Sequence, residues 1–335
     1  MAIKFGSASI SKIYLGSNEI SKAYLGSNEV FSSGLDGTSF ITTWRTTSVN
    51  ETITIPTIGG GYNYDISTSD GQTFTGLTGN HTITFANAGD YDVSISGDFP
   101  LIYINNGVDK DKIIDIKQWG NIVWTNFLRA FSGCSNLVGS FTDAPNLANV
   151  TNFQDSFRNC SSFSANLSSW DVSNVTSFAS TFIIFGGGVT APSTPVSGLG
   201  SWDMSSATNI GSMFRKQINY NEDLSSWDVS NVKNMLNVFW GSTSFDQDLS
   251  NWNIINVTNF NDFAKDATFS TSNYDAILIG WESTLQATYP NGSGYTASIS
   301  TSFGSSKYTS GGTAAAARAS LVSNFGWSIV DGGTA

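Results

Sequence analysis

Hydrophobic residues recur at a nearly constant interval through the second half of the chain. Trp202, Trp227 and Trp252 are 25 residues apart, and one longer step before Trp202 accommodates an insertion within residues 183–200. A fixed period in the twenties is typical of repeat proteins, in which each coil buries its apolar face only against its neighbours. The pattern therefore predicts six stacked coils over residues 120–269.

Large apolar residues form columns in the predicted coils. The first column contains Phe127, Phe153, Phe178, Ile210, Met235 and Phe260. The second column, four residues further along each coil, contains Phe131, Phe157, Phe182, Phe214, Phe239 and Ala264. A third column contains Leu137, Phe163 and Phe245. Because stacked repeats bury equivalent positions together, these columns predict the core.

Spacing within one coil predicts its local structure. Trp227 and Val229 alternate, so both point to one face of a short strand. Val232, Met235 and Phe239 have the spacing of one face of a helix. We therefore expect each coil to consist of a strand, a turn and a short helix.

Residues 36–105 show the alternation of apolar and polar residues that is typical of β-strands. Glycine-rich turns separate five predicted strands, at residues 40–44, 52–55, 62–66, 81–85 and 91–96. Short strands at this spacing predict a β-sandwich. The segment from Phe85 to Gly97 resembles the late strands of the PKD-like immunoglobulin-type domain. This resemblance implies a spacer or interaction module rather than an enzyme.

Residues 1–35 contain a ten-residue repeat in which Gly-Ser-Asn-Glu turns separate short apolar segments. Three strands of this length bury little core, so the module is expected to contact a partner. The apolar residues available for attachment or oligomerisation are Tyr14, Leu15, Tyr24, Leu25 and Phe31. The repeat resembles segments at the ends of bacteriophage virion proteins, which implies attachment to a particle. A disordered tail is the alternative.

The coils carry a specific motif. Residues 223–235 read Asp-Leu-Ser-Ser-Trp-Asp-Val-Ser-Asn-Val-Lys-Asn-Met. They resemble the BspA-like leucine-rich repeats of bacterial surface proteins, also found in Mycoplasma lipoproteins. The resemblance implies a leucine-rich-repeat-type solenoid over residues 106–269, displayed on a surface and binding proteins or glycans. Residues 270–335 are expected to cap it with a helix begun at Ser272, a second helix over 313–324 and a last strand.

Composition agrees with a mainly β fold that carries short helices. Charged residues make up 12% of the chain and aromatic residues 13%, which favours strands and turns over helical bundles. The net charge of −11 argues against a nucleic-acid-binding surface, which needs clustered Lys and Arg. No apolar run approaches the ~20 residues of a membrane span, and the first residues show no secretory signal.

Candidate chemistry is sparse, and we expect the protein not to be an enzyme. His81 is the one histidine, so its count excludes a multi-histidine metal site or a His-based triad. Cys134 and Cys160 occupy equivalent positions in adjacent coils, where a disulfide or a pair of buried thiols would fit. Two cysteines cannot form a zinc site without further ligands.

An acidic column is the most conspicuous candidate for ligand binding. Asp171, Asp203 and Asp228 follow successive tryptophans, and the column ends at Asn253. No cofactor is expected apart from calcium, which stacked carboxylates would suit as they would a cationic group of a ligand. The alternative is a structural role, in which each aspartate pairs with nearby turn residues, because like charges on neighbouring coils repel. Phe185, in the insertion, is a second candidate contact.

These observations favour a bacteriophage virion surface protein, such as a spike, fibre or capsid decoration protein, that recognises a host receptor through the solenoid. The expected partners are other virion proteins, bound through residues 1–35, and a host cell-surface protein or glycan. We expect a homo-oligomer and neither nucleic-acid binding nor membrane insertion. A bacterial cell-surface or extracellular adhesin is the alternative. The enzymatic alternative is a glycan depolymerase. Hydrolysis of a host polysaccharide that is abolished by Asp203→Asn or Asp228→Asn would support it.

Overall fold

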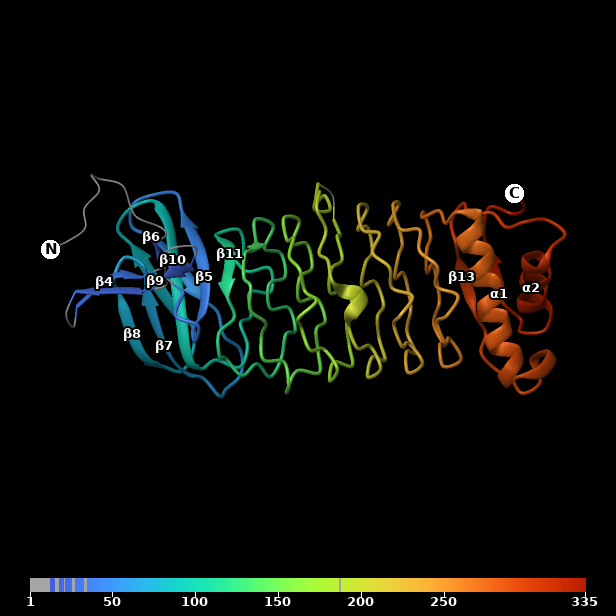
Figure 1. Ribbon diagram of the computed structural model, residues 1–335, viewed down its shortest axis with the longest axis horizontal. Helices are drawn as coiled ribbons and strands as arrows, with labels where there is room; N and C mark the ends of the chain where they lie inside the picture. Colours follow the sequence, from blue (N-terminus) through green and yellow to red (C-terminus); the bar gives the residue numbers. More distant parts are fainter. Residues whose placement is uncertain (1–12, 16–17, 21, 26–27, 33–34, 187) are drawn as a thin grey trace.

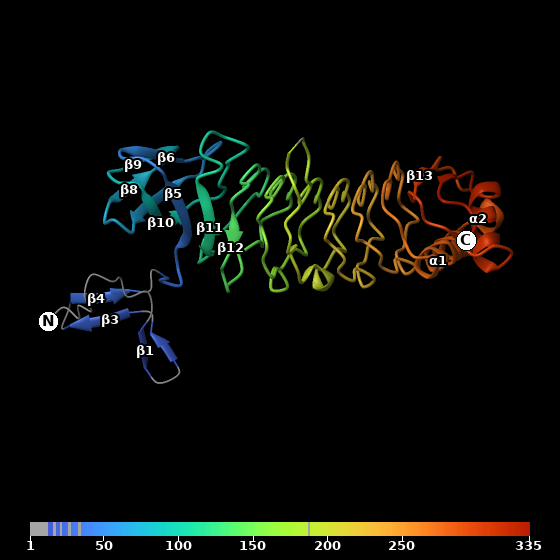
Figure 2. The same cartoon turned by 90° about the horizontal axis from the view of Figure 1, so that it is seen from above.

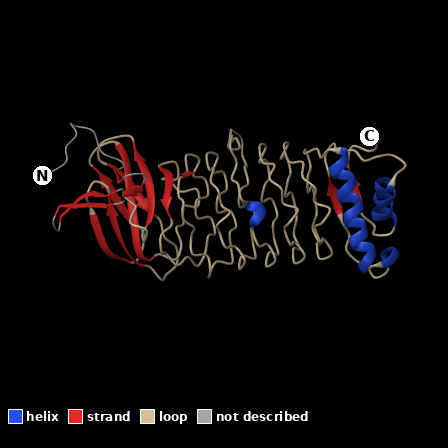
Figure 3. Ribbon diagram, in the orientation of Figure 1, coloured by secondary structure: helices blue, strands red, loops and turns tan. Residues whose placement is uncertain are grey.

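The computed structural model describes residues 13–15, 18–20, 22–25, 28–32, 35–186 and 188–335, with side chains from residue 35 onward. The chain is mainly β with few helices. Figure 1 shows an elongated molecule with strands at one end, a row of coils in the middle and helices at the other end. Figure 3 shows the same division by secondary structure. Within the described residues, no helix is long and apolar enough to span a membrane.

Two short hairpins precede the first large sheet. β1 (Ile13–Leu15) pairs antiparallel with β2 (Asn18–Ile20), and β3 (Lys22–Leu25) pairs antiparallel with β4 (Asn28–Ser32). Three of these strands contain the residues predicted for attachment: Tyr14, Leu15, Tyr24, Leu25 and Phe31. Their side chains lie outside the described part of the chain, as does most of the first copy of the repeat. The attachment role therefore stays a prediction.

Eight further strands form two sheets. They are β5 (Phe40–Thr46), β6 (Glu51–Ile55), β7 (Asn63–Thr68), β8 (Thr73–Leu77), β9 (His81–Phe85), β10 (Gly89–Asp98), β11 (Ile113–Gln118) and β12 (Val138–Gly139). One sheet has the order β12-β11-β5-β10-β7-β8, and β6 pairs antiparallel with β9 in the other. Alternation predicted five of these strands. It missed β8, whose residues are exposed or half-buried throughout and include a glycine.

The two sheets share one hydrophobic core. Along β7 exposed and buried residues alternate, and Phe40, Trp44, Ile53 and Ile83 are fully buried between the layers. The larger sheet continues past residue 105, where we expected the β-domain to end, because β11 pairs with β5 and β12 pairs with β11. The first coils are therefore joined directly to the sheet.

The coils stack in a single row, which is visible in both perpendicular views (Figures 1 and 2). Parallel β-bridges run from coil to coil through Asn152, Ser177, Asn209, Asn234 and Asn259. All three predicted apolar columns are buried. Tyr220 adds a member to the third column where we predicted none, since its ring centre lies 4.5 Å from that of Phe214 and 6.2 Å from that of Phe245.

The predicted strand and helix within each coil are wrong, because the two segments consist of turns, irregular backbone and isolated bridges. In one coil, the N–H of Thr181 donates to the carbonyl of Phe178 (3.2 Å), and Ser180 between them has a φ of 57°. A positive φ at the third position is typical of a type II β-turn. Apolar residues four positions apart are therefore buried by successive turns of this kind and not by one helix.

Hydrogen bonds along the row replace those that a helix would make within a coil. The N–H groups of alternate residues donate to carbonyls of the following coil, pairing Met235 with Asn259, Asn237 with Asn261 and Phe239 with Phe263 at 2.8–3.0 Å. Each coil thus satisfies backbone groups of its neighbour, which is the requirement for a stack without regular strands.

The C-terminal part contains two helices and a small sheet. α1 (Thr271–Thr288) and α2 (Thr313–Ser323) agree with the predicted helices, and β13 (Ser300–Ser302) pairs parallel with β14 (Ser328–Val330). Single 3₁₀ turns lie at η1 (Leu199–Ser201) and η2 (Pro290–Gly292). The N-cap of α1 is Ser270 and not the expected Ser272. Ser270 is fixed by Asp246 of the last coils, whose Oδ1 accepts from its N–H at 2.8 Å.

Helix α1 covers the last coil. Trp281 is buried, and its ring centre lies 5.2 Å from that of Phe260 and 5.8 Å from that of Phe263. The apolar face of the final coil is therefore closed by an aromatic side chain from the helix, which is what the end of a stack requires.

Candidate functional site

The acidic column shapes turns. Oδ1 of Asp171, Asp203 and Asp228 accepts a hydrogen bond from the backbone N–H two residues on, at 2.9–3.1 Å, and Oδ1 of Asn253 accepts the same bond at 3.2 Å. This Asx turn explains why asparagine can replace aspartate in the column. Hydrogen bonds from Ser205 lower the pKa of Asp203. All four side chains are exposed.

The acidic column is not part of a recognisable metal centre. The described residues contain no group of three or more His, Cys, Asp or Glu side chains placed to hold a metal ion. The hydrogen bonds give direct support to the turn role of the column, whereas calcium binding there stays a prediction without such a group of ligands among the described residues.

Asparagine side chains connect neighbouring coils. Nδ2 of Asn174, Asn231 and Asn256 donates to a backbone carbonyl of the preceding coil at 2.7–3.2 Å. Asn234 combines two roles, since its Oδ1 accepts from the N–H of Leu236 and its Nδ2 donates to Oδ1 of Asn209 (2.9 Å). These polar positions hold the stack together.

The tryptophans of the repeat face the core and form a hydrogen-bonded ladder. Each indole Nε1 donates to a leucine backbone carbonyl of the preceding coil at 2.8–3.0 Å. The bonds run from Trp202 to Leu167, from Trp227 to Leu199 and from Trp252 to Leu224. Trp281 of helix α1 continues the ladder to Leu249 (2.8 Å). Trp170, at the start, has no hydrogen-bond partner for Nε1 within the described residues. The indoles are therefore structural.

Both cysteines and the histidine are also placed in packed surroundings. The described structure holds Cys134 and Cys160 as buried free thiols, and Sγ–H of Cys160 donates to the carbonyl of Phe131 (3.1 Å). Burial raises the pKa of both thiols, which keeps them protonated and unreactive. The His81 ring lies 4.3 Å from that of Phe74, and its Nε2 is buried without a hydrogen-bond partner in the described part of the chain.

A row of alternating cations and aromatic rings crosses five coils at one edge. This basic–aromatic row consists of Arg158, Phe185, Arg215, Trp240 and Lys265. The guanidinium carbons of Arg158 and Arg215 lie 5.5 and 5.1 Å from the ring centre of Phe185. Arg215 lies 3.8 Å, and Nζ of Lys265 lies 4.9 Å, from the ring centre of Trp240. Each distance is within the range of a cation–π interaction.

The backbone of the coils sets the register of the row. Ile184 donates to the carbonyl of Arg215 (3.0 Å), Lys216 to that of Trp240 (2.8 Å) and Gly241 to that of Lys265 (2.7 Å). Phe185 comes from the insertion, and its N–H donates to Oδ1 of Asn159 (2.7 Å). Its side chain remains 44% exposed. Of these residues, only Phe185 was a predicted contact.

The sequence contained a signal for the rest of the row. Arg158, Arg215, Trp240 and Lys265 each directly follow a member of the second apolar column. Aligning the coils on that column would have placed them side by side. An exposed residue next to a core position carries no apolar pattern of its own, so hydrophobic periodicity alone does not reveal the row.

A polar hollow adjoins the row. It has a volume of about 330 Å³ and is lined by Asn105, Asn106, Arg129, Ser132, Arg158 and Asn159. Asp155, with only 8% of its side chain exposed, lies 3.4 Å from Arg129 and 3.7 Å from Arg158. The carboxylate thus holds two arginines at the edge of the hollow.

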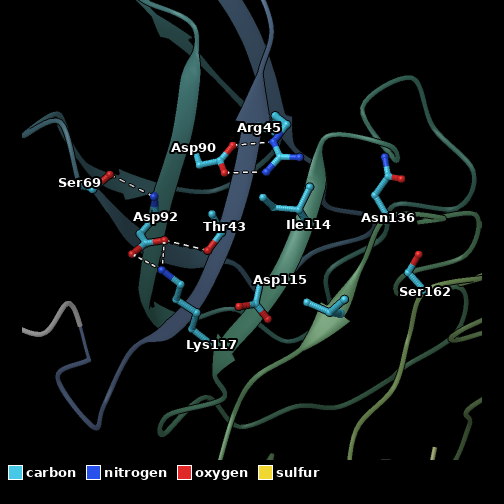
Figure 4. Close-up of a pocket in the computed structure, with 11 residues that line it drawn as sticks. Thr43, Arg45, Ser69, Asp90, Asp92, Ile114, Asp115, Lys117, Asn136 and Ser162 are labelled. Atoms are coloured by element: carbon cyan, nitrogen blue, oxygen red, sulfur yellow. Dashed lines mark hydrogen bonds and ion pairs between the residues drawn. The ribbon is translucent and has the colours of Figure 1, made fainter. Parts of the chain in front are cut away.

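A larger open pocket of about 790 Å³ lies on the outer face of the six-stranded sheet (Figure 4). Arg45 on β5 pairs with Asp90 on β10 (2.7 Å), and Lys117 on β11 pairs with Asp92 on β10 (2.8 Å). Asp115 accepts from Oγ of Ser140 (2.6 Å). Both cations are thus already paired, and the third carboxylate, Asp115, adds a negative charge, so the pocket offers an anionic ligand less than the row does. Sequence reasoning missed the pocket because its partners lie far apart in the chain.

The stacked bridges and recurrent turns define a mainly β repeat protein. A family model described as "Mycoplasma protein of unknown function, DUF285" matches residues 106–184 and 189–284, just over half of the chain. The chain belongs to this family. The four residues between the two matches begin with Phe185, and residues 1–105 lie outside them. Neither the curated proteins nor the solved structures searched contained a match.

Proposed function

We propose that this chain is a non-catalytic recognition protein, displayed on a surface, whose coils present a ligand-binding edge. The observation that carries the proposal is the basic–aromatic row. The repeated Trp, Asp, Asn and Val positions serve the core and the turns, whereas the row changes from coil to coil and stays accessible at Phe185. Recognition by repeat proteins commonly uses such variable positions on a constant scaffold.

The wider architecture supports the same proposal. Residues 106–269 form a solenoid of the BspA-like leucine-rich-repeat class, supported by coil-to-coil bridges and by the Mycoplasma family match. Residues 36–105 form a PKD-like β-sandwich, supported by the two sheets with a shared core. The sandwich is a spacer that holds the solenoid away from the point of attachment.

Residues 1–35 attach the protein to its host assembly. The support is the paired hairpins β1–β2 and β3–β4, which are too short to be stable alone. The assembly is a bacteriophage virion, as the resemblance of these residues implies. A bacterial cell surface is the second candidate, favoured by the matching family, which is described as a Mycoplasma protein.

Immunogold labelling of intact producing cells and of particles purified from them tests the proposal. Antibodies against the coils should label one of these two surfaces, and a variant lacking residues 1–34 should be made and folded but lose the surface label. Label confined to the cell interior would contradict the proposal. Hydrolysis of a host polysaccharide by the purified protein would contradict its non-catalytic part.

A further inference from the structure

Building on the proposed recognition role, we infer that the basic–aromatic row binds an acidic polysaccharide, a linear glycan with recurrent carboxylate groups. The starting observation is a local reversal of charge. The whole chain has a net charge of −11, but one edge of the first, second, fourth and sixth coils carries the cations Arg129, Arg158, Arg215, Lys216 and Lys265. A basic stripe on an acidic protein attracts anions locally while the remaining surface repels them.

Part of this positive charge is uncompensated. Asp155 faces Arg129 and Arg158, and Asp262 lies 3.5 Å from Lys265. By contrast, Arg215 and Lys216 form no ion pair with a carboxylate in the described part of the chain, and Asp262 acts on Arg215 only from beyond ion-pair distance. An anionic ligand would therefore supply the missing partner at the centre of the row.

Arg215 is held ready for such a ligand. Its guanidinium lies between the rings of Phe185 and Trp240, and Trp240 is itself fixed by a hydrogen bond from Nε1 to Asp266 (2.8 Å). Of its side-chain nitrogens only Nε is fully buried without a partner in the described structure. The two Nη groups are thus free to donate to a carboxylate. A guanidinium already ordered by stacking loses little entropy when it binds.

The spacing of the cations selects a linear, repeating anion. Arg158, Arg215 and Lys265 belong to every second coil, with an aromatic ring between each pair. Two coils correspond to about 10 Å, twice the usual separation of hydrogen-bonded strands. A polysaccharide with one acidic sugar in each disaccharide presents its carboxylates at a comparable interval.

The surroundings of the row suit sugars better than other polyanions. The adjoining hollow presents Asn105, Asn106, Asn159 and Ser132, whose amide and hydroxyl groups can bond to sugar hydroxyls. A nucleic acid would require many more cations, since each bound phosphate is neutralised separately. An acidic peptide presents carboxylates but not the recurrent hydroxyl groups that the amides of the hollow can bind. These two ligands are alternative outcomes of the test.

Calorimetric titration of the full-length protein tests the inference. The probes are oligosaccharides of hyaluronan, which has one uronate in each disaccharide, and of alginate and polygalacturonate, in which every sugar, and so also every second one, is a uronate; the three are grouped here as polyuronates. Dextran is the neutral control, and poly-glutamate and single-stranded DNA are other polyanions. We expect at least one polyuronate to bind, with an affinity that falls as salt rises. Equal or tighter binding of poly-glutamate or DNA would overturn the choice of ligand.

The row itself is tested with Arg158→Gln combined with Lys265→Gln, both at exposed side chains that are not part of the core. We expect about tenfold weaker polyuronate binding, since two charge-assisted contacts are lost. Lys233→Gln, an exposed lysine of the same coils outside the row, is the matched control and should bind like the parent. Unchanged binding by the double variant, with an unchanged thermal midpoint, would overturn the assignment to the row.

The outcomes separate the two proposals. A protein that is displayed on cells or particles but binds none of the three polyuronates overturns the inference and leaves the proposed function standing. A protein that is not displayed overturns the proposed function whatever it binds.

Discussion

At the scale of single residues, similar side chains in the coils differ in their hydrogen bonds. The indoles of Trp170 and Trp227 are both 97% buried, since each has a relative exposure of 3%. Trp227 donates to the Leu199 carbonyl, whereas Trp170 has no acceptor within the described residues. The two positions therefore separate the contribution of packing from that of the hydrogen bond.

Trp227→Phe should cost more stability than Trp170→Phe. Both changes remove a similar apolar volume, but only the first removes a hydrogen bond, and the Leu199 carbonyl then keeps only its bond from the N–H of Trp202 (3.0 Å). The additional loss should be about 0.5–1.5 kcal/mol, the usual net contribution of one hydrogen bond. Urea denaturation of the two variants measures the difference, and equal losses would show that the ladder contributes only packing.

A second residue-scale prediction concerns pH. Backbone hydrogen bonds from Thr47, together with Lys112 (3.0 Å), lower the pKa of Glu51 to about 2. The ionised form is thus favoured in the folded protein. The contribution of Glu51 to stability is present above its pKa in the unfolded chain, about 4.3. It is lost as the pH falls through the lower pKa of Glu51 in the folded protein.

The thermal midpoint of the parent should therefore decrease more steeply between pH 4.5 and pH 2 than that of Glu51→Gln. Glu282→Gln provides a control at a carboxylate whose bond, from Ser320 (2.7 Å), lies in the C-terminal helices. A parent and Glu51→Gln variant with parallel pH profiles would contradict the prediction.

At this scale the sequence predicted the candidate roles of the acidic column but not the basic–aromatic row. Asp171, Asp203 and Asp228 were expected either to bind a ligand or to shape turns, and the observed Asx turns give the second role direct support. The row was overlooked because its cations and rings meet only across coils. The sequence pattern within a single segment cannot show that Arg215 lies between Phe185 and Trp240, which come from other coils.

At the scale of elements, the turn is the unit of the coil. Residues with positive φ recur at equivalent positions, including Ser180, Ser212 and Asn237 at 57–59°. The period of four between buried positions resembles a helix, which is why we predicted one. The polar residues at positive φ were the contrary signal, since Asn, Asp and Ser adopt this conformation more readily than larger side chains.

Substitutions at Asn237 distinguish the turn from a helix. In the observed turn, Asn237→Gly should be tolerated, and Asn237→Ala should cost about 1 kcal/mol because alanine disfavours a positive φ. A helix would give the opposite order, since alanine is the better helix former by about 1 kcal/mol. Chemical denaturation of both variants decides between a turn and a helix. Ser212→Gly and Ser212→Ala repeat the experiment independently at the equivalent position.

The five strands of the β-domain were easier to predict than the coils. Alternation along β7 and β9 follows directly from burial of one face against a second sheet. β11 and β12 were not assigned to the sheet, because their pairing with β5 and with each other joins segments far apart in the sequence. A local sequence pattern identifies strands but not the strands with which they pair.

At the scale of the whole molecule, the stack has two different ends. The first coils are joined to the six-stranded sheet through β11 and β12, and the last is closed by Trp281 and helix α1. Both ends of the apolar interior are thereby covered. An uncovered coil would present its aromatic columns to water or to another molecule.

Removal of residues 270–335 should therefore make the protein associate. The truncation exposes Phe260, Phe263 and Phe269, which are buried in the full chain. Light scattering and size-exclusion chromatography should show oligomers or aggregates, while removal of residues 1–34 should leave the coils soluble. A truncated protein that stays monomeric and keeps its thermal midpoint would show that the cap is dispensable.

The bond between Trp281 and Leu249 has a consequence for how such chains change their length. The cap binds the last coil through the same indole-to-carbonyl hydrogen bond that Trp202, Trp227 and Trp252 make with the coil before them. Because the acceptor is a backbone carbonyl, a cap of this kind can bind any coil that presents the carbonyl at this position. Duplication or loss of one 25-residue unit in the gene would thus preserve both ends, and the reach of the molecule can vary during evolution without redesign of its termini.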